Sequence, residues 1–393
     1  MSGAAGGLRV LRIVTRLNVG GPTRQVISLT RDLGGPPGAA MLLAGEIGRG
    51  EGDWTSRAAT LGSAFRLVAG LGRGLSPRTL AAAARSIRVE IRRFRPDVVH
   101  THESRAGAIG RWAARRERVP VVVHTHHGHV LRSYFGPALS AGLRLVERRL
   151  AAMSDALVVP APEIADELAL LGVAGREKFV PIAPGLDVAE HLAGPVAPDP
   201  TCRSRLGIAA DAPVVGFVGR LVPVKDPLLF VAAARRVLLS FPDTVFLVAG
   251  DGPLRSAAEH ATGNDCRAFR FLGFREDPLD LLRALDVFAV TSRHEGLPAS
   301  LVEAMACGAA PVASKVGGIP GLVDHGVSGR LFPPGDAAAA AEAIVFLLAS
   351  RAEREREGAA ARRAIRERGY SPAKMARELA SLYERLVARR GAP

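Results

Sequence analysis

Short apolar runs alternate with amphipathic stretches along the first half of the chain. The runs are rich in Val, Ile, Leu and Ala, as in "LRVLRIVT", "PVVVHTH" and "DALVVP". The stretches between them carry apolar residues at three- and four-residue spacing, as in "SPRTLAAAARSIRVEIRRF". Such short runs are typical of strands buried on both faces, and the spacing between them indicates helices. The pattern predicts a parallel sheet with helices on both faces.

The alternation stops in a stretch rich in Pro, Gly and Ala and then starts again with "VVGFVG", "TVFLVAG" and "DVFAVT". The interruption indicates a connection between domains. We predict the fold class α/β, with two doubly wound, Rossmann-like domains facing a central cleft. The first would span residues 1–185, a linker 186–212 and the second domain 213–370. A C-terminal helix over 371–393 is expected to pack back toward the first domain.

The composition agrees with two globular domains in a reducing compartment. The chain has 393 residues, of which 48% are hydrophobic and 23% charged, which is typical of folded proteins. Its three cysteines, Cys202, Cys266 and Cys307, are too few and too far apart for a disulfide framework or a zinc knuckle. The N-terminus resembles a first strand more than a signal peptide, and no apolar run reaches the roughly 18 residues that span a bilayer. We expect a cytoplasmic protein, with peripheral attachment at the inner face of the plasma membrane left open.

The positive charge is concentrated in one part of the first half. The net charge is +14, and residues 76–150 hold fifteen Arg against five Asp or Glu. Three interpretations stay open: a solvated helix surface, attraction to anionic lipid headgroups or phosphate-bearing substrates, and nucleic-acid binding. Aromatic residues make up only 5% of the chain and do not interleave with the basic runs. Nucleic acid is therefore not expected as a partner.

The first strand of each predicted domain is followed by residues that suit a phosphate group. In the first domain, Gly20 and Gly21 bring bare backbone to a helix start, although such a pair is also common in ordinary turns. In the second domain, Gly219 and Arg220 follow the strand and Lys225 precedes the next helix. Two cations beside a helix start predict a diphosphate site. The alternative is that both cations are merely solvated.

The stretch "TSRHEGLPASLVEAMACG" places two glutamates eight residues apart. Glu295 ends a predicted strand, and Glu303 lies inside the helix that Pro298 starts. A carboxylate accepts two hydrogen bonds side by side and can hold a pair of sugar hydroxyls. Three amides at the helix start can bind an anion, those of Ala299, Ser300 and Leu301.

These stretches resemble family 4 of the retaining glycosyltransferases, which have the two-domain GT-B fold. "EGLPASLVEAMACG" matches the family's motif of Glu, seven residues and Glu, and "VGRLVPVKDP", "LVAGDGPLR" and "VGGIPGLVDHGVSGRLFPPGD" extend the match. In the first half, "PDVVHTHESRAGAIGR" and "VVVHTHHGHVLRSYFG" resemble the subgroup that builds bacterial surface polysaccharides. The resemblance covers nearly the whole chain.

The resemblance implies a role for each matching residue. Arg220 and Lys225 would hold the donor diphosphate, and Glu303 would bind the ribose. Glu295 and His127 would face the transferred sugar. The implied catalytic set is Glu295, His127, Arg220 and Lys225. The implied donor-binding set is Gly20, Gly21, Gly219, Arg220, Lys225, Gly250, Phe274, Ala299, Ser300, Leu301 and Glu303.

The histidine cluster "HTHHGH" raises the question of a metal. Strand alternation places His124 and His126 on one side and His127 on the other. No Cys and only Glu103 lie near enough in sequence to complete a ligand set. The chain also lacks an Asp-x-Asp pair to chelate a divalent ion. We therefore expect no metal and no cofactor, and we place His102 and His126 on the acceptor side.

The predicted function is that of a metal-independent, retaining glycosyltransferase (EC 2.4 type). It would move a sugar from a nucleotide diphosphate sugar, UDP- or GDP-linked, to a saccharide or lipid-linked acceptor, in cell-surface polysaccharide or glycolipid synthesis. Expected partners are that donor and that acceptor, and peripheral contact with an anionic membrane surface stays open. Two alternatives stay open. One is a nucleotide-sugar 2-epimerase on the same fold, and the other is a non-catalytic basic protein that binds membranes or nucleic acid.

Overall fold

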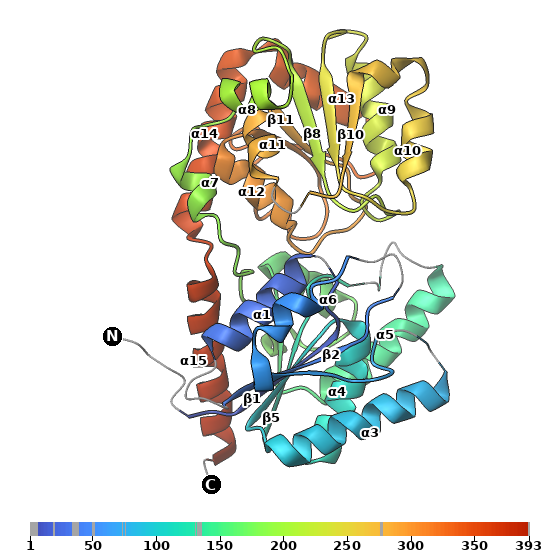
Figure 1. Cartoon of the computed structure of the whole chain (residues 1–393), viewed down its shortest axis with the longest axis vertical. Helices are drawn as coiled ribbons and strands as arrows, with labels where there is room; N and C mark the ends of the chain where they lie inside the picture. Colours follow the sequence, from blue (N-terminus) through green and yellow to red (C-terminus); the bar gives the residue numbers. More distant parts are fainter. Residues whose placement is uncertain are drawn as a thin grey trace. The chain divides into compact units, whose positions relative to one another are not determined.

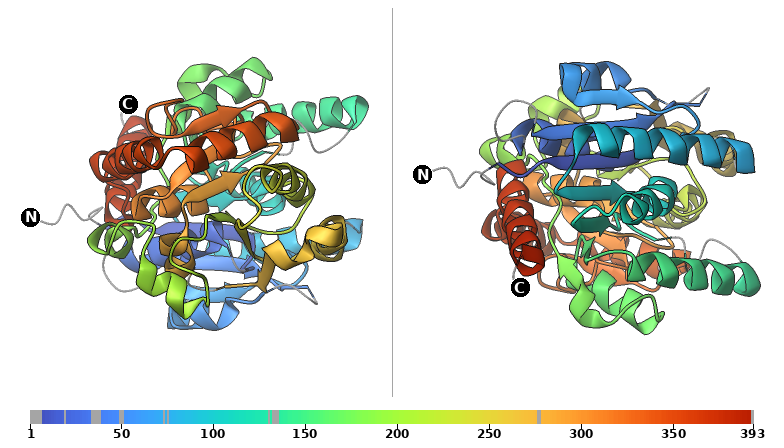
Figure 2. Two further views of the ribbon diagram at one scale, coloured as in Figure 1. Left: turned by 90° about the horizontal axis from the view of Figure 1, so that it is seen from above. Right: turned by 90° about the horizontal axis from the view of Figure 1, so that it is seen from below.

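A computed structural model describes residues 7–18, 20–33, 39–48, 52–72, 74, 76–129, 131, 136–275 and 278–391. The chain divides into two compact units. The first comprises residues 1–186 and 370–393, and the second comprises residues 187–369. Each unit contains one parallel sheet with helices on both faces (Figures 1 and 2). The predicted pair of doubly wound α/β sheets is therefore confirmed.

The sheet of the first unit has seven parallel strands. In spatial order they are β3 (Phe65–Leu67), β2 (Ala40–Gly45), β1 (Val10–Arg16), β4 (Val98–His102), β5 (Val121–Thr125), β6 (Ala156–Val159) and β7 (Phe179–Pro181). The helices of this unit are α1 (Gly21–Asp32), α2 (Thr55–Ala59), α3 (Pro77–Phe94), α4 (Ser104–Arg116), α5 (Pro137–Ala152), α6 (Pro162–Leu170) and α15 (Pro372–Gly391). Because β1 and β4 are neighbours and the order reverses between them, the sheet has its switch point there.

The two faces of the first sheet bury different helices. Leu11 and Ile13 of β1 pack on the side of α3 and α4, whereas Val10 packs on the side of α1 and α15. The helix α3 shows how the sequence encodes this packing. Ser76 caps its start by accepting a hydrogen bond from the amide of Thr79, and apolar residues at helical spacing face the core. Those buried residues are Ala83, Ile87, Ile91 and Phe94.

The sheet of the second unit has six parallel strands. In spatial order they are β10 (Phe269–Gly273), β9 (Val245–Ala249), β8 (Val214–Val218), β11 (Val287–Val290), β12 (Ala310–Ser314) and β13 (Arg330–Phe332). The helices are α7 (Ala189–Ala193), α8 (Pro200–Arg205), α9 (Pro227–Val237), α10 (Arg255–Ala261), α11 (Leu279–Ala284), α12 (Ala299–Cys307), α13 (Ala337–Ala349) and α14 (Arg351–Arg368). The described part of the chain also contains the 3₁₀ turns η1 (Gly62–Ala64), η2 (Arg176–Lys178) and η3 (Gly263–Ala268). The switch point of this sheet lies between β8 and β11.

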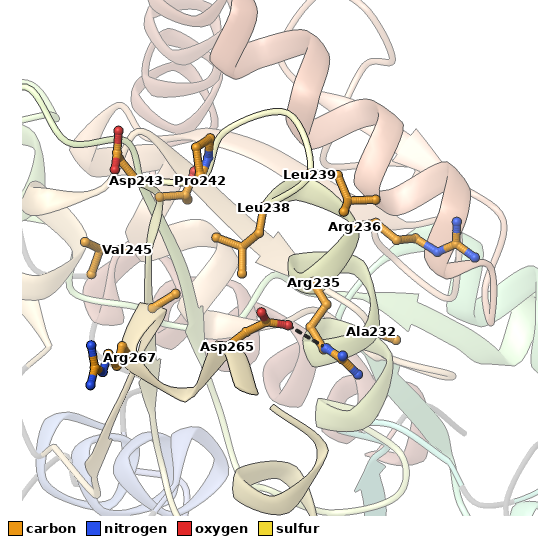
Figure 3. Close-up of a pocket in the computed structure, with 12 residues that line it drawn as sticks. Ala232, Arg235, Arg236, Leu238, Leu239, Pro242, Asp243, Val245, Asp265 and Arg267 are labelled. Carbon is orange, nitrogen blue, oxygen red and sulfur yellow. Dashed lines mark hydrogen bonds and ion pairs between the residues drawn. The ribbon is translucent and has the colours of Figure 1, made fainter. Parts of the chain in front are cut away.

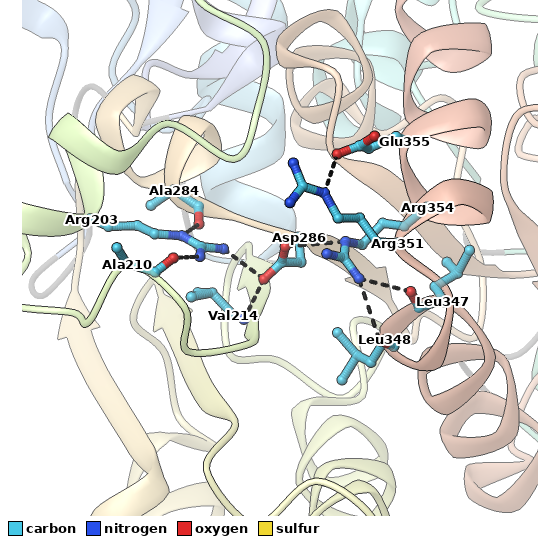
Figure 4. Close-up of polar contacts among 10 residues, drawn as sticks. All are labelled: Arg203, Ala210, Val214, Ala284, Asp286, Leu347, Leu348, Arg351, Arg354 and Glu355. Atoms are coloured by element: carbon cyan, nitrogen blue, oxygen red, sulfur yellow. Dashed lines mark hydrogen bonds and ion pairs between the residues drawn. The ribbon is translucent and has the colours of Figure 1, made fainter.

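The segment before the second sheet folds with the second unit. Its helix α8 carries Arg203, which is 4% exposed. The guanidinium of Arg203 donates to the carboxylate of Asp286 at 2.6 Å, and that carboxylate also accepts from the amide of Val214 (Figure 4). A buried ion pair with several hydrogen bonds fixes this segment to the edge of β8 and β11.

The helix α15 belongs to the first unit. Its apolar residues Leu379, Leu382 and Tyr383 pack in one cluster with Val98 and Val123 of the first sheet.

None of the described helices is long and apolar enough to span a bilayer.

Candidate functional site

Except for Gly20 and Gly21, which belong to the first unit, the predicted donor residues lie in the second unit, around the carboxyl edge of its sheet. Gly219, Arg220 and Lys225 follow β8, and Glu295 follows β11. Ligands of open parallel sheets bind beyond the carboxyl ends of the strands, at the switch point. In the second unit, the sequence-predicted residues therefore stand where the topology favours a ligand.

The loop that carries Arg220 is held by backbone contacts with the next loop. The amide of Gly219 donates to the carbonyl of Ala249 at 2.9 Å, and the amide of Leu221 donates to the carbonyl of Asp251 at 2.9 Å. Gly250 has a φ of +139°, and a side chain there would collide with the carbonyl oxygen of Gly219. Only glycine fits at Gly250 without strain. The structure thus gives Gly250 a packing role that shapes the loop.

Lys225 and Glu295 form the centre of the site. The Lys225 Nζ lies 2.5 Å from Glu295 Oε1, and the hydroxyl of Ser292 donates to the same oxygen at 2.6 Å. Glu295 is 8% exposed. Charge-assisted hydrogen bonds of this length are strong and hold both side chains in one geometry. The two residues line a small pocket together with Ser292, Pro298 and Ser300.

Arg220 and Phe274 are the exposed members of the predicted site. No carboxylate among the described residues forms an ion pair with Arg220. Phe274 follows β10 and is 55% exposed. An unpaired guanidinium suits an anion, and an exposed aromatic ring suits a flat heterocycle.

The start of α12 differs in one respect from the prediction. The amide of Leu301 donates to the carbonyl of Pro298 at 3.1 Å, and Leu301 is fully buried. That bond tightens the first turn, so of the three amides expected to bind an anion, that of Leu301 already has a partner within the helix. Ala299 and Ser300 remain partly exposed at the helix start. Glu303, also partly exposed, lies one turn further along α12.

In the first unit, the glycine loop lies at the corresponding switch point. Gly20 precedes α1, which begins at Gly21 with a proline in its first turn. A Cβ on Gly20 would meet only the ring of Pro22, at 3.9 Å. The loop therefore leaves open space beside a helix N-terminus, which suits a ligand.

One set of histidines lies on the α4 side of the first sheet. His124 Nδ1 is 2.9 Å from the Thr101 hydroxyl, and the rings of His124 and His126 meet edge to face at 4.5 Å. The Nε2 of His126 is 3.6 Å from a carboxylate oxygen of Glu147. Burial lowers the pKa of His126 to about 4, and the nearby Glu147 opposes this shift.

The same set has the donor atoms of a metal site but already contains a cation. His124, His126 and Glu147 could together offer three ligand atoms to an ion. The fully buried guanidinium of Arg111 donates to the same Glu147 oxygen at 2.8 Å. Arg111 already supplies the positive charge that compensates this carboxylate, and a divalent ion beside it would be repelled. The residues present therefore fit an ion pair better than a metal.

The second histidine set lies on the α15 side. His102 Nδ1 is 3.1 Å from His127 Nε2, and the ring of His102 stacks on that of His100 with centroids 4.3 Å apart. The strand alternation that predicted His127 on the side opposite to His124 and His126 is confirmed. Burial lowers the pKa of His127 to about 4, so its imidazole is neutral at pH 7.

The two residues predicted on the acceptor side are both buried. His102 is fully buried and His126 is 6% exposed, whereas His127 is only partly buried. The sequence reasoning also missed residues that complete these networks, Ser292, Glu147 and Tyr383. Ser292 lies three residues before Glu295 and could have been found from that spacing. Tyr383 contacts His100 from 283 residues away, and no local signal reveals such a contact.

A wide surface hollow lies elsewhere on the second unit. It is lined by the end of α9, the segment that follows this helix and the start of β9, including Arg235, Leu239 and Val245. Arg235 is paired with Asp265 at 2.8 Å (Figure 3). The hollow therefore borders the amino end of β9. The predicted donor residues follow the carboxyl ends of β8 and β11, so the hollow is separate from them.

Comparisons with known proteins identify the family. Residues 10–185 match a family model described as a glycosyl transferase 4-like domain, and residues 212–350 match one described as glycosyl transferases group 1. A D-inositol 3-phosphate glycosyltransferase from Xylanimonas cellulosilytica is 33% identical over 320 residues, which cover 75% of this chain and 73% of that protein. The chain belongs to the group 1 glycosyltransferases, family GT4.

Two further relatives match a smaller share of this GT4 chain. A D-inositol 3-phosphate glycosyltransferase from Saccharomonospora viridis is 34% identical over 63% of this chain. A UDP-Gal:alpha-D-GlcNAc-diphosphoundecaprenol alpha-1,3-galactosyltransferase from Escherichia coli is 31% identical over 61% of it. The matched regions span 61% and 63% of the length of these two relatives.

Solved structures agree with this chain in fold. HepE from Anabaena, in complex with UDP, superposes with a TM-score of 0.76 at 21% identity, over 96% of this chain and 100% of that one. A sucrose-phosphate synthase from Thermosynechococcus elongatus gives 0.79 at 22% identity, over 97% and 100%. The GT4 chain therefore has the GT-B fold, as the sequence predicted.

Proposed function

We propose that this GT4 chain is a retaining glycosyltransferase that uses a nucleotide diphosphate sugar, UDP- or GDP-linked. The acceptor is a hydroxyl of a saccharide or a lipid-linked saccharide, and the product serves a cell-surface polysaccharide or glycolipid. One observation carries the proposal: Arg220, Lys225 and Glu295 stand together at the carboxyl edge of the second sheet, beside its switch point. The name of the Escherichia coli relative, which contains a UDP-sugar and a lipid-linked acceptor, supports it.

The cations of the second unit suit the leaving group. Breaking the bond to the anomeric carbon leaves negative charge on the diphosphate, and Arg220 and Lys225 stabilise that charge. Lys225 bonds Glu295 at 2.5 Å, so a diphosphate would share Lys225 with this carboxylate. Glu303 binds the ribose, and the exposed ring of Phe274 lies against the base. Two protein cations make a metal ion unnecessary for charge neutralisation.

The surroundings of Glu295 bear on how the configuration is retained. One carboxylate oxygen accepts hydrogen bonds from both Lys225 and Ser292. A carboxylate held in this way is a weakened nucleophile, because its charge is already compensated. This favours attack by the acceptor on the face that the diphosphate leaves, with a phosphate oxygen taking the proton. A covalent intermediate on Glu295 is the less favoured alternative.

The test is product analysis with labelled donors. A thermal-shift screen of UDP- and GDP-sugars selects the donor, and that donor is incubated with and without saccharide and lipid-linked acceptors. Transfer to an acceptor with the donor's anomeric configuration supports the proposal. Accumulation of an epimerised nucleotide sugar without acceptor would identify a 2-epimerase instead. Salt-sensitive binding to vesicles or nucleic acid with no donor affinity would favour a non-catalytic protein.

The helix α5 supports peripheral binding to an anionic membrane, at the cytoplasmic face. Only Ser140 and Ala151 of its sixteen residues are buried. Leu139, Leu145 and Val146 are each at least 50% exposed, and two exposed arginines follow them, Arg148 and Arg149. An apolar face beside basic residues suits the interface of a bilayer that contains anionic lipids.

The membrane proposal is tested by sedimentation with vesicles. The chain should bind vesicles that contain phosphatidylglycerol and should release them at high salt. Leu145→Ser with Val146→Ser should abolish binding while the circular dichroism spectrum is unchanged. Val89→Ser on α3, which also replaces an exposed apolar residue (48% exposed), is the matched control. Equal binding of the double variant and the control would overturn the assignment to α5.

A further inference from the structure

The buried side chains behind His127 form a continuous polar line in the first unit. Tyr383 of α15, His100 and His102 of β4, and His127 after β5 follow one another along one face of the sheet. His100 and His102 are fully buried. Buried polar groups are costly unless each one finds a partner. A row of buried polar side chains in this position therefore indicates a role beyond packing.

The inner end of the line fixes His100. Its Nδ1 lies 2.6 Å from the Tyr383 hydroxyl, and its Nε2 lies 2.7 Å from the Thr125 hydroxyl. Burial raises the pKa of the Tyr383 hydroxyl, and the positive charge of the buried Arg12 guanidinium opposes this shift. With both ring nitrogens engaged, His100 cannot turn, and its ring supports the stacked ring of His102.

The outer end of the line fixes a tautomer. His102 Nδ1 and His127 Nε2 are 3.1 Å apart, so one of them must carry the hydrogen. His102 Nε2 is buried and has no hydrogen-bond partner among the described residues. Among backbone groups, a buried N–H without an acceptor is rarer than a buried carbonyl without a donor, and we apply the same preference to the imidazole. The proton of His102 therefore lies on Nδ1 and is donated to His127 Nε2.

We propose that His102 is a positioning residue that holds neutral His127 with its proton on Nδ1, so that His127 donates a hydrogen bond to an oxygen of the transferred sugar. His127 then cannot be the base that deprotonates the acceptor through Nε2, since that lone pair is engaged by His102. The inference rests on the proposed transferase function for its substrate. The tautomer itself rests only on contacts within the first unit.

The tautomer is tested by long-range ¹H–¹⁵N NMR of the imidazoles in the full chain without substrate. In the wild-type protein, His127 should show a protonated Nδ1 and an unprotonated Nε2 at pH 7. A His127 protonated mainly on Nε2 would overturn the proposal. This spectrum needs no activity, so a chain that fails to transfer sugar can still pass or fail it.

Matched variants separate positioning from simple stability. His102→Leu removes the donor and should lower kcat by about tenfold to hundredfold with the donor KM unchanged, because His127 loses its fixed orientation. His102→Asn keeps an amide donor near the Nδ1 position and should restore most of kcat. Tyr383→Phe removes only the hydroxyl that contacts His100. It should shift the His127 tautomer away from the form protonated on Nδ1, as His102→Leu does, but to a smaller extent.

The control lies on the opposite face of the same strand. Thr101→Val removes a hydroxyl bonded to buried His124 but leaves His102 and His127 untouched, so neither the tautomer nor kcat should change. His102→Leu in a His127→Ala background should cost nothing further in kcat. Equal losses in His102→Leu and His102→Asn, or additive losses with His127→Ala, would refute a positioning role.

Discussion

Replacing Arg203 with methionine is expected to destabilise the second unit by about 3 kcal/mol, at the lower end of the range for broken buried ion pairs. Methionine keeps the apolar stem of the side chain and removes its charge and donors. The substitution isolates the contacts by which α8 is held to the second sheet (Figure 4).

The magnitude follows from what each partner loses. The Arg203 guanidinium donates to the carbonyls of Ala284 and Ala210, at 3.0 and 2.6 Å, as well as to Asp286. Without it, the Asp286 carboxylate keeps Arg354 at 3.1 Å and the amide of Val214 at 2.8 Å. The carboxylate thus stays partly compensated, while two carbonyls lose their donor at a cost of roughly 1–3 kcal/mol each. These losses place the expected effect near the lower end of the range.

The assay is urea unfolding followed by circular dichroism, with hydrogen exchange of β8 and β11 peptides to assign the transition to the second unit. Arg205→Met is the matched control, because Arg205 lies on the same helix and pairs with Asp280 in an exposed bridge, with side chains 60% and 49% exposed. The control should leave the urea midpoint within error. Equal small shifts in the two variants would refute the buried pair as the anchor of this segment.

Three further outcomes are expected. Protonation of His126 should lower the free energy of unfolding of the first unit by about 3 kcal/mol as the pH drops from about 6.5 to 4. The pKa of His126 in the folded chain is about 4, below its ordinary value, so the unfolded chain takes up the proton first as the pH falls. Neutral His126 therefore makes its full contribution to stability only above about pH 6.5. Unfolding curves that do not change over this range would contradict this prediction. Gly250→Ala should weaken donor binding in calorimetry by displacing the loop of Arg220, whereas Gly326→Ala, at φ +76° with open space, should not. Transfer activity should persist in excess EDTA, and loss that Mg²⁺ or Mn²⁺ restores would show that a metal takes part.

Much of the fold could be predicted because its strands are short, apolar and separated by helices. The edge strand β3 has three residues, all partly or fully exposed, and therefore shows no apolar run. The helices α7 and α8 have five and six residues, too few for a helical period to appear. Such elements form through tertiary contacts, as Arg203 of α8 illustrates.

In the site, too, strand order could be predicted, whereas contacts between side chains could not. Lys225 and Glu295 could be placed from the strands that they follow, because carboxyl ends of parallel neighbours share an edge. That the Lys225 ammonium bonds the Glu295 carboxylate could not be foreseen, since it depends on side-chain packing. Tyr383 and Glu147 reach the histidines from distant helices, and only the folded chain reveals that His102 faces His127.

Calorimetry of donor binding tests the central claim most directly. UDP, GDP and the donor sugar selected by thermal shift are titrated into the full chain and into Lys225→Ala, Glu303→Ala and Arg236→Ala. Arg236 is an exposed cation at the far end of α9, so its removal matches the charge change of Lys225→Ala. The account predicts wild-type affinity for Arg236→Ala and a loss of about tenfold to hundredfold for the other two, as expected for hydrogen bonds to charged groups. Equal affinity in all four proteins, or no binding of any nucleotide diphosphate, would contradict it.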